Sequence, residues 1–316
     1  MKMLSICIPC FNESQNIEIA YQRITEVMQG VLEVDYEIVF ADNNSTDGSQ
    51  DVLRALTKRD ERVKAILNQS NYGPLRSGMN CLLRARGDAV ISFPCDLQEP
   101  PEAIPHFVRK WLEGNKVVWG RKTSSGENGV MYRIRALYYK ILNHFSETPF
   151  YEQVDGFGIL DREVVDQLRK LYAPYRGVKT IVSSLGYDVA IIPYVQNARL
   201  RGESTYSIGS YFRLALDTLV EISSRPVFII ASTGGLMSLL ACMLLIGAIV
   251  WVCVTGLTET SPLLLMMALL ILLLSLLLLA LGVIGTYVVH MFQRCTPQPM
   301  VIEKESLNFP NEKEEK

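Results

Sequence analysis

The chain has 316 residues, of which 49% are hydrophobic, and its formal net charge is −2. This hydrophobic content is too high for an ordinary soluble enzyme, yet the first two hundred residues have a soluble composition, so the apolar residues must be concentrated further along the chain. The sequence has no basic excess, which argues against nucleic acid as a partner because proteins that bind polyphosphate chains nonspecifically usually carry one.

Short apolar segments alternate with helix-like segments in the first part of the chain. Strands are predicted at 4–8, 36–41, 63–67, 89–93 and 117–119, and helices at 14–29, 47–59, 75–86 and 101–113. This alternation predicts an α/β fold in which helices cover both faces of a mostly parallel sheet. Ligands of such sheets bind outside the carboxyl ends of the strands, so the residues that follow each strand are the candidates for function.

The next segment is less regular and indicates an extension of the same domain rather than a second domain. It contains a predicted helix at 131–145, a strand at 157–160, a helix ending at 171 and a strand at 189–193. Residues 1–206 are therefore assigned to one domain. Apolar residues at three- and four-residue spacing then predict an amphipathic helix at 207–225, which lies either in the membrane interface or against this domain.

Two long apolar segments, 226–255 and 262–292, contain no Lys, Arg or Asp. Each is long enough to cross a hydrocarbon core of about 30 Å, which predicts a hairpin of two transmembrane helices and a lipid bilayer as partner. The connection between the two segments has no Lys or Arg, whereas Arg225 and Arg294 lie just outside the opposite ends of the hairpin. The positive-inside rule then predicts that the first domain and both termini are cytoplasmic.

Two further expectations concern the end of the chain and its assembly. The tail at 293–316 is charged, and from Glu303 onward it lacks apolar spacing, which predicts disorder. Small residues of the hairpin, such as Gly235 and Gly285, would allow close helix packing either within one hairpin or between copies, so a homo-oligomer is one expectation.

Polar residues follow three of the predicted strands. They are Pro9, Asn12 and Glu13 after the first, 42–48 after the second and 96–101 after the fourth. The Asp42 carboxylate can accept the ring N–H of uracil, and Asp96 can give oxygen ligands to a Mg²⁺ or Mn²⁺ ion that also holds a diphosphate. Asp47 is interpreted instead as a turn or N-cap residue.

Four segments resemble a known enzyme family. They are LSICIPCFNE at 4–13, DNNSTDG at 42–48, DLQEPPE at 96–102 and RLRGESTY at 199–206. These are similar to the opening strand and nucleotide-contacting turn, the DDxSxDG segment, the metal site and the phosphate loop of the family 2 glycosyltransferases of GT-A fold. Within that family the chain resembles the polyprenyl-phosphate glycosyltransferases over nearly its whole length.

The resemblance implies a reaction and its partners. A sugar would pass, with inversion, from a nucleotide-sugar, expected to be UDP-linked, to a polyprenyl phosphate such as undecaprenyl phosphate. The reaction would use Mg²⁺ or Mn²⁺ at the cytoplasmic face of a bacterial inner membrane. Its product would be a lipid-linked monosaccharide for cell-envelope glycans or glycoconjugates.

The resemblance also implies roles for individual residues. Contacts with the nucleotide-sugar are expected from Pro9, Asn12, Glu13, Asp42, Asn71, Arg76, Asp96 and Gln98, with Asp96 also as the metal ligand. Phosphate contacts are expected from Arg199, Arg201 and Ser204, and a second basic group consists of Arg121, Lys122, Arg133 and Arg135. That second group either lines the path of the lipid phosphate or is a solvated helix face.

Catalytic roles are implied for Asp155, Asp96 and Arg199. Asp155 lies near the position of the family's candidate base, and it would act either as a base or as an orienting residue. A phosphate monoester, with a second pKa of about 6, is already a nucleophile at neutral pH and needs little help from a base. Arg199 offers fork-shaped donors suited to phosphate oxygens.

The sequence departs from the family pattern at two positions. Pro94 replaces the first acid of the usual Asp-x-Asp metal motif, so Asp96 would hold the ion together with the diphosphate and water. Asn43 replaces the second acid of the paired Asp-Asp and offers hydrogen bonds without charge. Two alternatives stay open: a processive polysaccharide synthase, suggested by Gln196-x-x-Arg199, and a catalytically weak nucleotide-sugar-binding membrane protein, suggested by Pro94.

Overall fold

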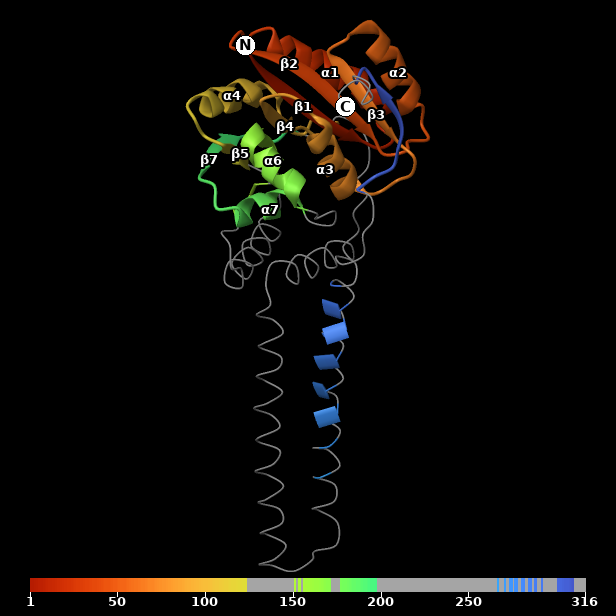
Figure 1. Cartoon of the computed structure of the whole chain (residues 1–316), viewed down its shortest axis with the longest axis vertical. Helices are drawn as coiled ribbons and strands as arrows, with labels where there is room; N and C mark the ends of the chain where they lie inside the picture. Colours follow the sequence, from red (N-terminus) through yellow and green to blue (C-terminus); the bar gives the residue numbers. More distant parts are fainter. Residues whose placement is uncertain are drawn as a thin grey trace, which may run out of the picture. The chain divides into compact units, whose positions relative to one another are not determined.

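The computed structural model describes residues 1–123, 151, 153–154, 156–171, 177–197 and 300–309, together with scattered residues between 266 and 291 (Figure 1). The predicted helix at 131–145, the amphipathic helix at 207–225 and the first apolar segment at 226–255 lie outside the described residues. The described residues at 1–197 and 300–309 belong to one compact unit.

The first part of the chain has the predicted alternation of strands and helices. Its elements are β1 (Lys2–Cys10), α1 (Ser14–Met28), β2 (Val34–Asp42), α2 (Ser49–Arg59), β3 (Val63–Asn68), α3 (Pro74–Arg84), β4 (Ala89–Ser92), a 3₁₀ turn (Pro101–Ala103), α4 (Ile104–Leu112) and β5 (Val117–Lys122). The predicted elements are confirmed, with bounds that differ by a few residues at the ends. One predicted helix, at 101–113, is divided into the 3₁₀ turn and α4.

Among the described residues, the rest of the unit contributes three further strands and two helices. They are β6 (Gly158–Asp161), α6 (Arg162–Lys170), α7 (Val178–Ser184), β7 (Val189–Tyr194) and β8 (Glu303–Leu307). The short helix α7 was not predicted, because β-branched residues dominate it and favour strands. Its helical form exists because Ile181 and Val182 are buried in the core beside α6.

The eight strands form one sheet in the order β7-β5-β6-β4-β1-β2-β3-β8. Strand β1 pairs in parallel with β2 and β4, β2 pairs in parallel with β3, and β5 pairs in parallel with β7. Strand β6 is antiparallel to both of its neighbours, and β8 is antiparallel to β3. The expected α/β fold with a mostly parallel sheet is thus confirmed for the described residues.

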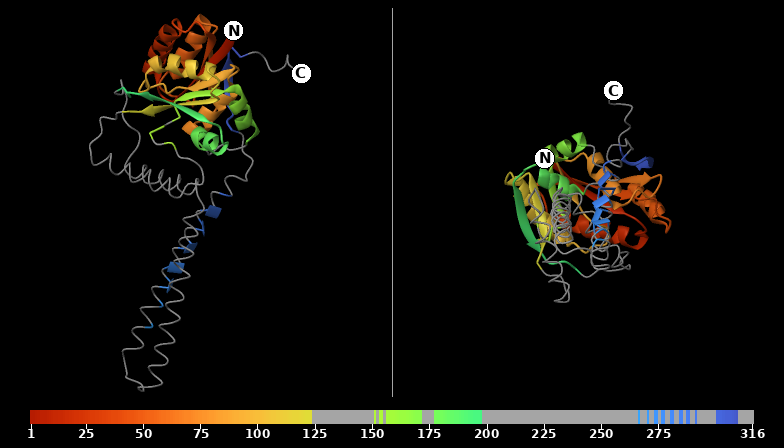
Figure 2. Two further views of the ribbon diagram at one scale, coloured as in Figure 1. Left: turned by 90° about the vertical axis from the view of Figure 1, so that its left-hand side faces the viewer. Right: turned by 90° about the horizontal axis from the view of Figure 1, so that it is seen from below.

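Helices cover both faces of the sheet, and Figures 1 and 2 show α1, α2 and α4 together and α3, α6 and α7 together. One apolar cluster joins the first group to strand residues such as Ile6 and Phe40, and the other joins the second group to Cys7 and Val39. Successive residues of β1 and β2 therefore alternate between two cores. Burial on both faces explains why these strands read as continuous apolar runs in the sequence.

The prediction of disorder from Glu303 onward is wrong for the first residues of this segment. Residues Glu303–Leu307 form β8 at the edge of the sheet, where Leu67 pairs with Glu305. The charged composition suggested a solvated segment. The sequence does not show that Glu305 has a cationic partner, because Arg54 lies far from it in the chain. In the fold the guanidinium of Arg54 is 2.8 Å from the Glu305 carboxylate.

The described part of the second apolar segment is helical. Its large side chains, including Leu270, Leu281 and Met291, are exposed. Within the described residues, no helix combines the length and the apolar character that a membrane crossing requires. The two transmembrane helices therefore stay a prediction.

Candidate active site

The carboxyl ends of β1, β2, β3 and β4 lie side by side at one edge of the sheet. The parallel register places Cys10 beside Asp42, and Asp42 beside Leu67. On the other side of β1, the backbone N–H of Phe93, just after β4, donates to the Cys7 carbonyl at 2.8 Å. The fold therefore brings the polar segments that follow these four strands to a common edge, as the sequence predicts for the segments after β1, β2 and β4.

The segments after β1 and β2 are tied to each other. The backbone N–H of Asn12 donates to Ser45 Oγ at 2.8 Å, and Asn12 Oδ1 accepts from the backbone N–H of Thr46 at 2.9 Å. Asn12 has a φ of 56°, a conformation that asparagine adopts more readily than most residues. The backbone N–H of Glu13 donates to Ser49 Oγ at 3.1 Å. The two segments thus form one rigid corner of the site.

Asp47 stabilises this corner from the outside. Its carboxylate accepts from the backbone N–H of Ser14 at 2.9 Å and from the backbone N–H of Ser49 at 3.1 Å. Burial alone would raise the pKa of Asp47, but hydrogen bonds from Ser49 and Ser14 outweigh it and lower the pKa to about 2. The interpretation of Asp47 as a turn residue is confirmed.

Asp42 lies at the centre of the site and is fully buried. Its Oδ2 atom accepts from the backbone N–H of Ser45 at 3.0 Å and from Gln50 Nε2 at 2.9 Å. Its Oδ1 atom is also buried and has no hydrogen-bond partner within the described part of the chain. Because an unsatisfied buried carboxylate oxygen costs free energy, a ligand N–H that reaches this atom would stabilise the site.

A network of side-chain amides joins the ends of β2 and β3. Asn43 Nδ2 donates to Asn71 Oδ1 at 2.7 Å, and Asn43 Oδ1 accepts from the backbone N–H of Tyr72 at 3.0 Å. Asn68 Nδ2 donates to Asn43 Oδ1 at 3.3 Å, and the backbone N–H of Gly73 donates to Asn71 Oδ1 at 2.9 Å. The residue that departs from the family pattern, Asn43, therefore orders the segment that carries Asn71.

Arg76, predicted to contact the nucleotide-sugar, is anchored to two neighbours. Its Nε atom donates to the Met300 carbonyl at 2.7 Å, and its guanidinium lies over the Tyr72 ring at 4.9 Å from the centroid. The contact with Met300 has no signal in the sequence, since more than two hundred residues separate the two. Arg76 is close to the site, but part of its hydrogen-bonding capacity serves the C-terminal segment.

The loop after β4 carries Asp96 and Gln98. Asp96 Oδ1 accepts from the backbone N–H of Gln98 at 3.3 Å, and Leu97 between them has a φ of 55° and a buried side chain. The Gln98 carbonyl accepts from the backbone N–H of Asn197 at 2.8 Å, and Gln98 Oε1 accepts from Gln196 Nε2 at 3.2 Å. The predicted metal-site loop is therefore fixed to the segment just before Arg199.

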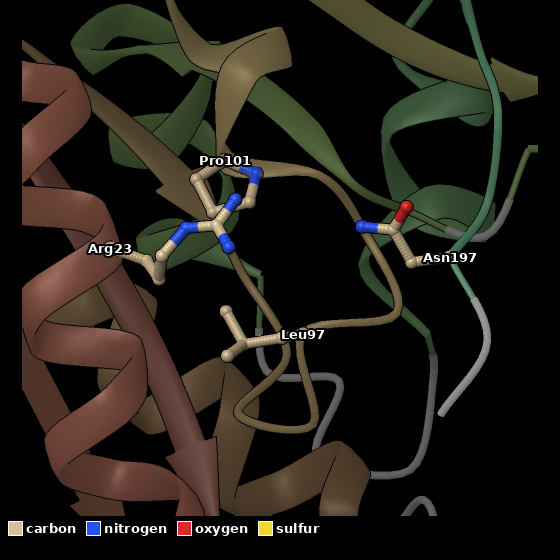
Figure 3. A pocket seen from close by; sticks show the side chains of 4 residues that line it. All are labelled: Arg23, Leu97, Pro101 and Asn197. Carbon is tan, nitrogen blue, oxygen red and sulfur yellow. The ribbon is translucent and has the colours of Figure 1, made fainter. Parts of the chain in front are cut away.

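A cavity of about 360 Å³ lies beside this loop and is lined by Arg23, Leu97, Pro101 and Asn197 (Figure 3). The side chains of Arg23 and Asn197 approach it from opposite sides in the close-up view. Arg23 also forms an ion pair with Glu102. The cavity adds one cation and one amide to the surroundings of the Asp96 loop, and neither was predicted from the sequence.

Of the second basic group, the structure describes Arg121 and Lys122. Arg121 is exposed on β5, whereas the Lys122 ammonium lies 3.7 Å from Glu99 Oε1. Glu99 is buried and also accepts from the Tyr194 hydroxyl at 3.3 Å. Lys122 is therefore bound to an internal carboxylate of the Asp96 loop, a partner that the sequence did not reveal.

Several predicted residues lie outside the described part of the chain. They are Arg133, Arg135, Asp155, Arg199, Arg201 and Ser204. Their assigned roles in catalysis and phosphate binding stay predictions. Pro9 is described, on β1 beside Ala41 of β2.

The donor atoms fit a metal ion that is held partly by its substrate. Among the described residues, no group of three or more His, Cys, Asp or Glu side chains could hold a metal ion by itself. Mg²⁺ is commonly bound by one or two carboxylates that act together with water and substrate phosphates. A single carboxylate at Asp96 is compatible with that arrangement.

In a mostly parallel α/β sheet, ligands bind outside the carboxyl ends of the strands, and this edge of the sheet carries carboxylates and amides. The family model described as "Glycosyl transferase family 2" matches residues 5–169, just over half of the chain. The chain belongs to this family and is a glycosyltransferase.

Relatives match over nearly the full length. "Uncharacterized glycosyltransferase YkcC" from Bacillus subtilis (strain 168) is 30% identical over 315 residues, which cover 98% of this chain and 95% of the relative. "SfII prophage-derived bactoprenol glucosyl transferase" from Shigella flexneri is 29% identical over 309 residues, which cover 96% and 98%. A solved glucosyl-3-phosphoglycerate synthase from Mycobacterium tuberculosis aligns over 70% of this chain and 78% of that chain, with 21% identity and a TM-score of 0.49.

Proposed function

We propose that this glycosyltransferase moves a sugar from a UDP-linked donor to a polyprenyl phosphate at the cytoplasmic face of a bacterial inner membrane. The observation that carries the proposal is the convergence of Asn12, Asp42, Asn71 and Asp96 at one edge of the sheet. The similarity to a bactoprenol glucosyl transferase over nearly the whole chain supports the polyprenyl acceptor.

The donor side of the site supplies acceptors for a nucleobase and a carboxylate for a metal ion. Asp42 Oδ1 lacks a partner within the described residues and would accept a ring N–H of the base once the covering side chains move. Asp96 would hold a Mg²⁺ or Mn²⁺ ion, which supplies charge neutralisation at the departing diphosphate. The corner formed by Asn12 and Glu13 would orient the nucleoside beside these groups.

The acceptor side must bring a second anion close to the diphosphate, so it needs cations. Arg199 and Arg201 would bind phosphate oxygens with paired donors, and Gln98 connects their segment to the Asp96 loop through Asn197. The lipid phosphate oxygen attacks the anomeric carbon, and the nucleoside diphosphate leaves from the opposite side. This single displacement inverts the configuration at the anomeric carbon.

The proposal is tested with purified full-length protein, polyprenyl phosphate and a panel of UDP- and GDP-sugars, with the lipid product identified by mass. We expect one lipid-linked monosaccharide that requires a divalent metal ion and does not form from the dephosphorylated polyprenol. A ladder of long products would favour a processive synthase instead. Donor binding without any transfer to the lipid would favour a nucleotide-sugar-binding protein.

A further inference from the structure

The C-terminal segment Met300–Phe309 is part of the glycosyltransferase domain. Strand β8 pairs antiparallel with β3, with Ala65 opposite Leu307 and Leu67 opposite Glu305. The register shifts between Leu67 and Asn68, at the end of β3 that leads into the site. This segment therefore covers the edge of the sheet beside the connection that carries Asn71 and the start of α3, which carries Arg76.

Polar contacts from α2 and α3, which belong to the two helix groups on opposite faces of the sheet, fix this strand. Arg54 donates to Glu305 Oε2 through Nε at 3.1 Å and Nη2 at 2.8 Å. Asn80 Nδ2 donates to Glu303 Oε1 at 2.9 Å, and the Arg84 guanidinium is 3.3 Å from the same oxygen. Charged residues that look solvated in the sequence are thus paired one by one with groups of the domain.

The last residues of the segment are anchored as well. Asn308 Nδ2 donates to the Thr57 carbonyl at 2.7 Å and to the Val63 carbonyl at 2.8 Å. The Phe309 ring lies below two cations, with Arg84 Cζ at 4.9 Å and Lys64 Nζ at 5.6 Å from its centroid. These contacts hold the segment to the domain in addition to its backbone pairing with β3.

The first residues of the segment reach residues 69–76, called the loop at 69–76, which comprise the connection after β3 (69–73) and the first residues of α3. The backbone N–H of Gln69 donates to the Ile302 carbonyl at 2.8 Å, and Arg76 Nε donates to the Met300 carbonyl at 2.7 Å. Both ends of the loop are therefore bonded to the C-terminal segment. Its middle is bonded to the site, because Asn71 and the backbone of Tyr72 contact Asn43.

We propose that Met300–Phe309 is a positioning element for the nucleotide-sugar donor, because it holds the loop at 69–76 in the shape that presents Asn71 and Arg76. The assignment of this role to the donor rests on the proposed function, whereas the ordering of the loop by this segment does not depend on it. None of its residues needs to touch the reacting atoms. Preorganised loops improve binding because the cost of ordering is met before the ligand arrives.

The test uses full-length protein in detergent with Arg54→Glu, which places like charges at Glu305, and with the charge-swapped pair Arg54→Glu/Glu305→Arg. The control is Arg62→Glu, the same charge change at the pair that an exposed Arg62 forms with a largely buried Asp60, at the other end of β3. Hydrogen exchange at residues 69–76 and the KM for each substrate are measured. A second variant, Asn308→Ala, loosens the same segment without a change of charge.

For Arg54→Glu and for Asn308→Ala, we expect faster exchange at 69–76 and a donor KM raised by about threefold to tenfold, with the acceptor KM unchanged. The charge-swapped pair should restore the wild-type exchange rate at 69–76 and the wild-type donor KM, and Arg62→Glu should leave both quantities unchanged. Unchanged exchange at 69–76 when β8 itself exchanges faster would overturn the proposal. If the wild-type protein transfers no sugar at all, the proposed function fails, whereas the exchange data still decide whether the segment orders the loop.

Discussion

Asn43 Nδ2 donates a hydrogen bond to Asn71 Oδ1 at 2.7 Å, which links the end of β2 to the loop after β3. Asn43 is also an acceptor for the backbone N–H of Tyr72. The amide of Asn43 both donates and accepts, whereas a carboxylate at this position could only accept. The departure from the paired acids of the family therefore has a structural reason within this chain.

Asn43→Asp should destabilise the loop after β3. The new carboxylate keeps the bond from Tyr72 but places an acceptor oxygen against Asn71 Oδ1, which costs about 1–3 kcal/mol of unfolding free energy. Chemical denaturation of the full-length protein measures this loss. Asn44→Asp makes the same charge change one residue later, and its loss of stability should be much smaller. Equal losses in both variants would show that charge alone, and not the amide pair, is responsible.

Asp96→Asn should abolish most of the transfer without unfolding the protein. Its side chain would still accept the hydrogen bond from the Gln98 backbone, but the neutral amide is a poor metal ligand, so we expect kcat to fall by about 100-fold. Initial rates at saturating donor and metal concentrations measure the effect. Asp35→Asn, an exposed change near the start of β2, is the control and should keep full activity. If Asp96→Asn transferred sugar at the wild-type rate, the proposal that Asp96 binds a metal ion needed for transfer would be wrong.

Glu37→Gln should lower stability, because Glu37 is a buried carboxylate on β2. It accepts from Ser5 Oγ at 2.5 Å and from the Arg86 backbone at 3.0 Å, and it forms an ion pair with Lys64. Removing the charge leaves the half-buried ammonium without its partner, at a cost of about 3 kcal/mol. Glu113→Gln breaks an exposed pair with Lys110 and should cost less than about 0.5 kcal/mol.

The same carboxylate predicts a dependence of stability on pH. Burial alone would raise the pKa of Glu37, but hydrogen bonds from Lys64, Ser5 and Arg86 outweigh it and lower the pKa below that of an ordinary glutamate. The stabilisation is complete above the unfolded pKa and is lost as pH falls through the folded pKa. Unfolding free energy measured from neutral pH down to acid should therefore decline less steeply in Glu37→Gln. Parallel curves for the two proteins would contradict this assignment.

Gly158→Ala should be severely destabilising. A Cβ atom at this position of β6 would lie 2.1 Å from the Val118 carbonyl oxygen and 2.8 Å from the Trp119 ring. Because the obstacle is backbone of a central strand, we expect a loss of about 3 kcal/mol. Gly78→Ala on α3 is the matched change, since its nearest neighbour would be 3.9 Å away. It should gain about 0.5–1 kcal/mol from helix propensity. Thermal unfolding of both variants distinguishes the two outcomes.

The sequence determined the alternation of strands and helices and the edge at which to look for function. Periodic apolar runs indicate which faces are buried, and parallel strands place their carboxyl ends together, so the sequence alone groups Asn12, Asp42 and Asp96. The segments that resemble family 2 glycosyltransferases then predicted which of these residues contact the nucleotide-sugar and the metal ion.

Which polar groups contact one another depends on how the chain folds. Nothing local in the sequence shows that Arg76 binds the Met300 carbonyl, that Lys122 faces Glu99, or that a charged tail becomes β8. Periodicity records the burial of a residue, whereas a hydrogen bond or ion pair depends on which distant segment arrives beside it. The partners of Arg76, Lys122 and β8 lie far from them in the chain, so they could be identified only in the folded protein.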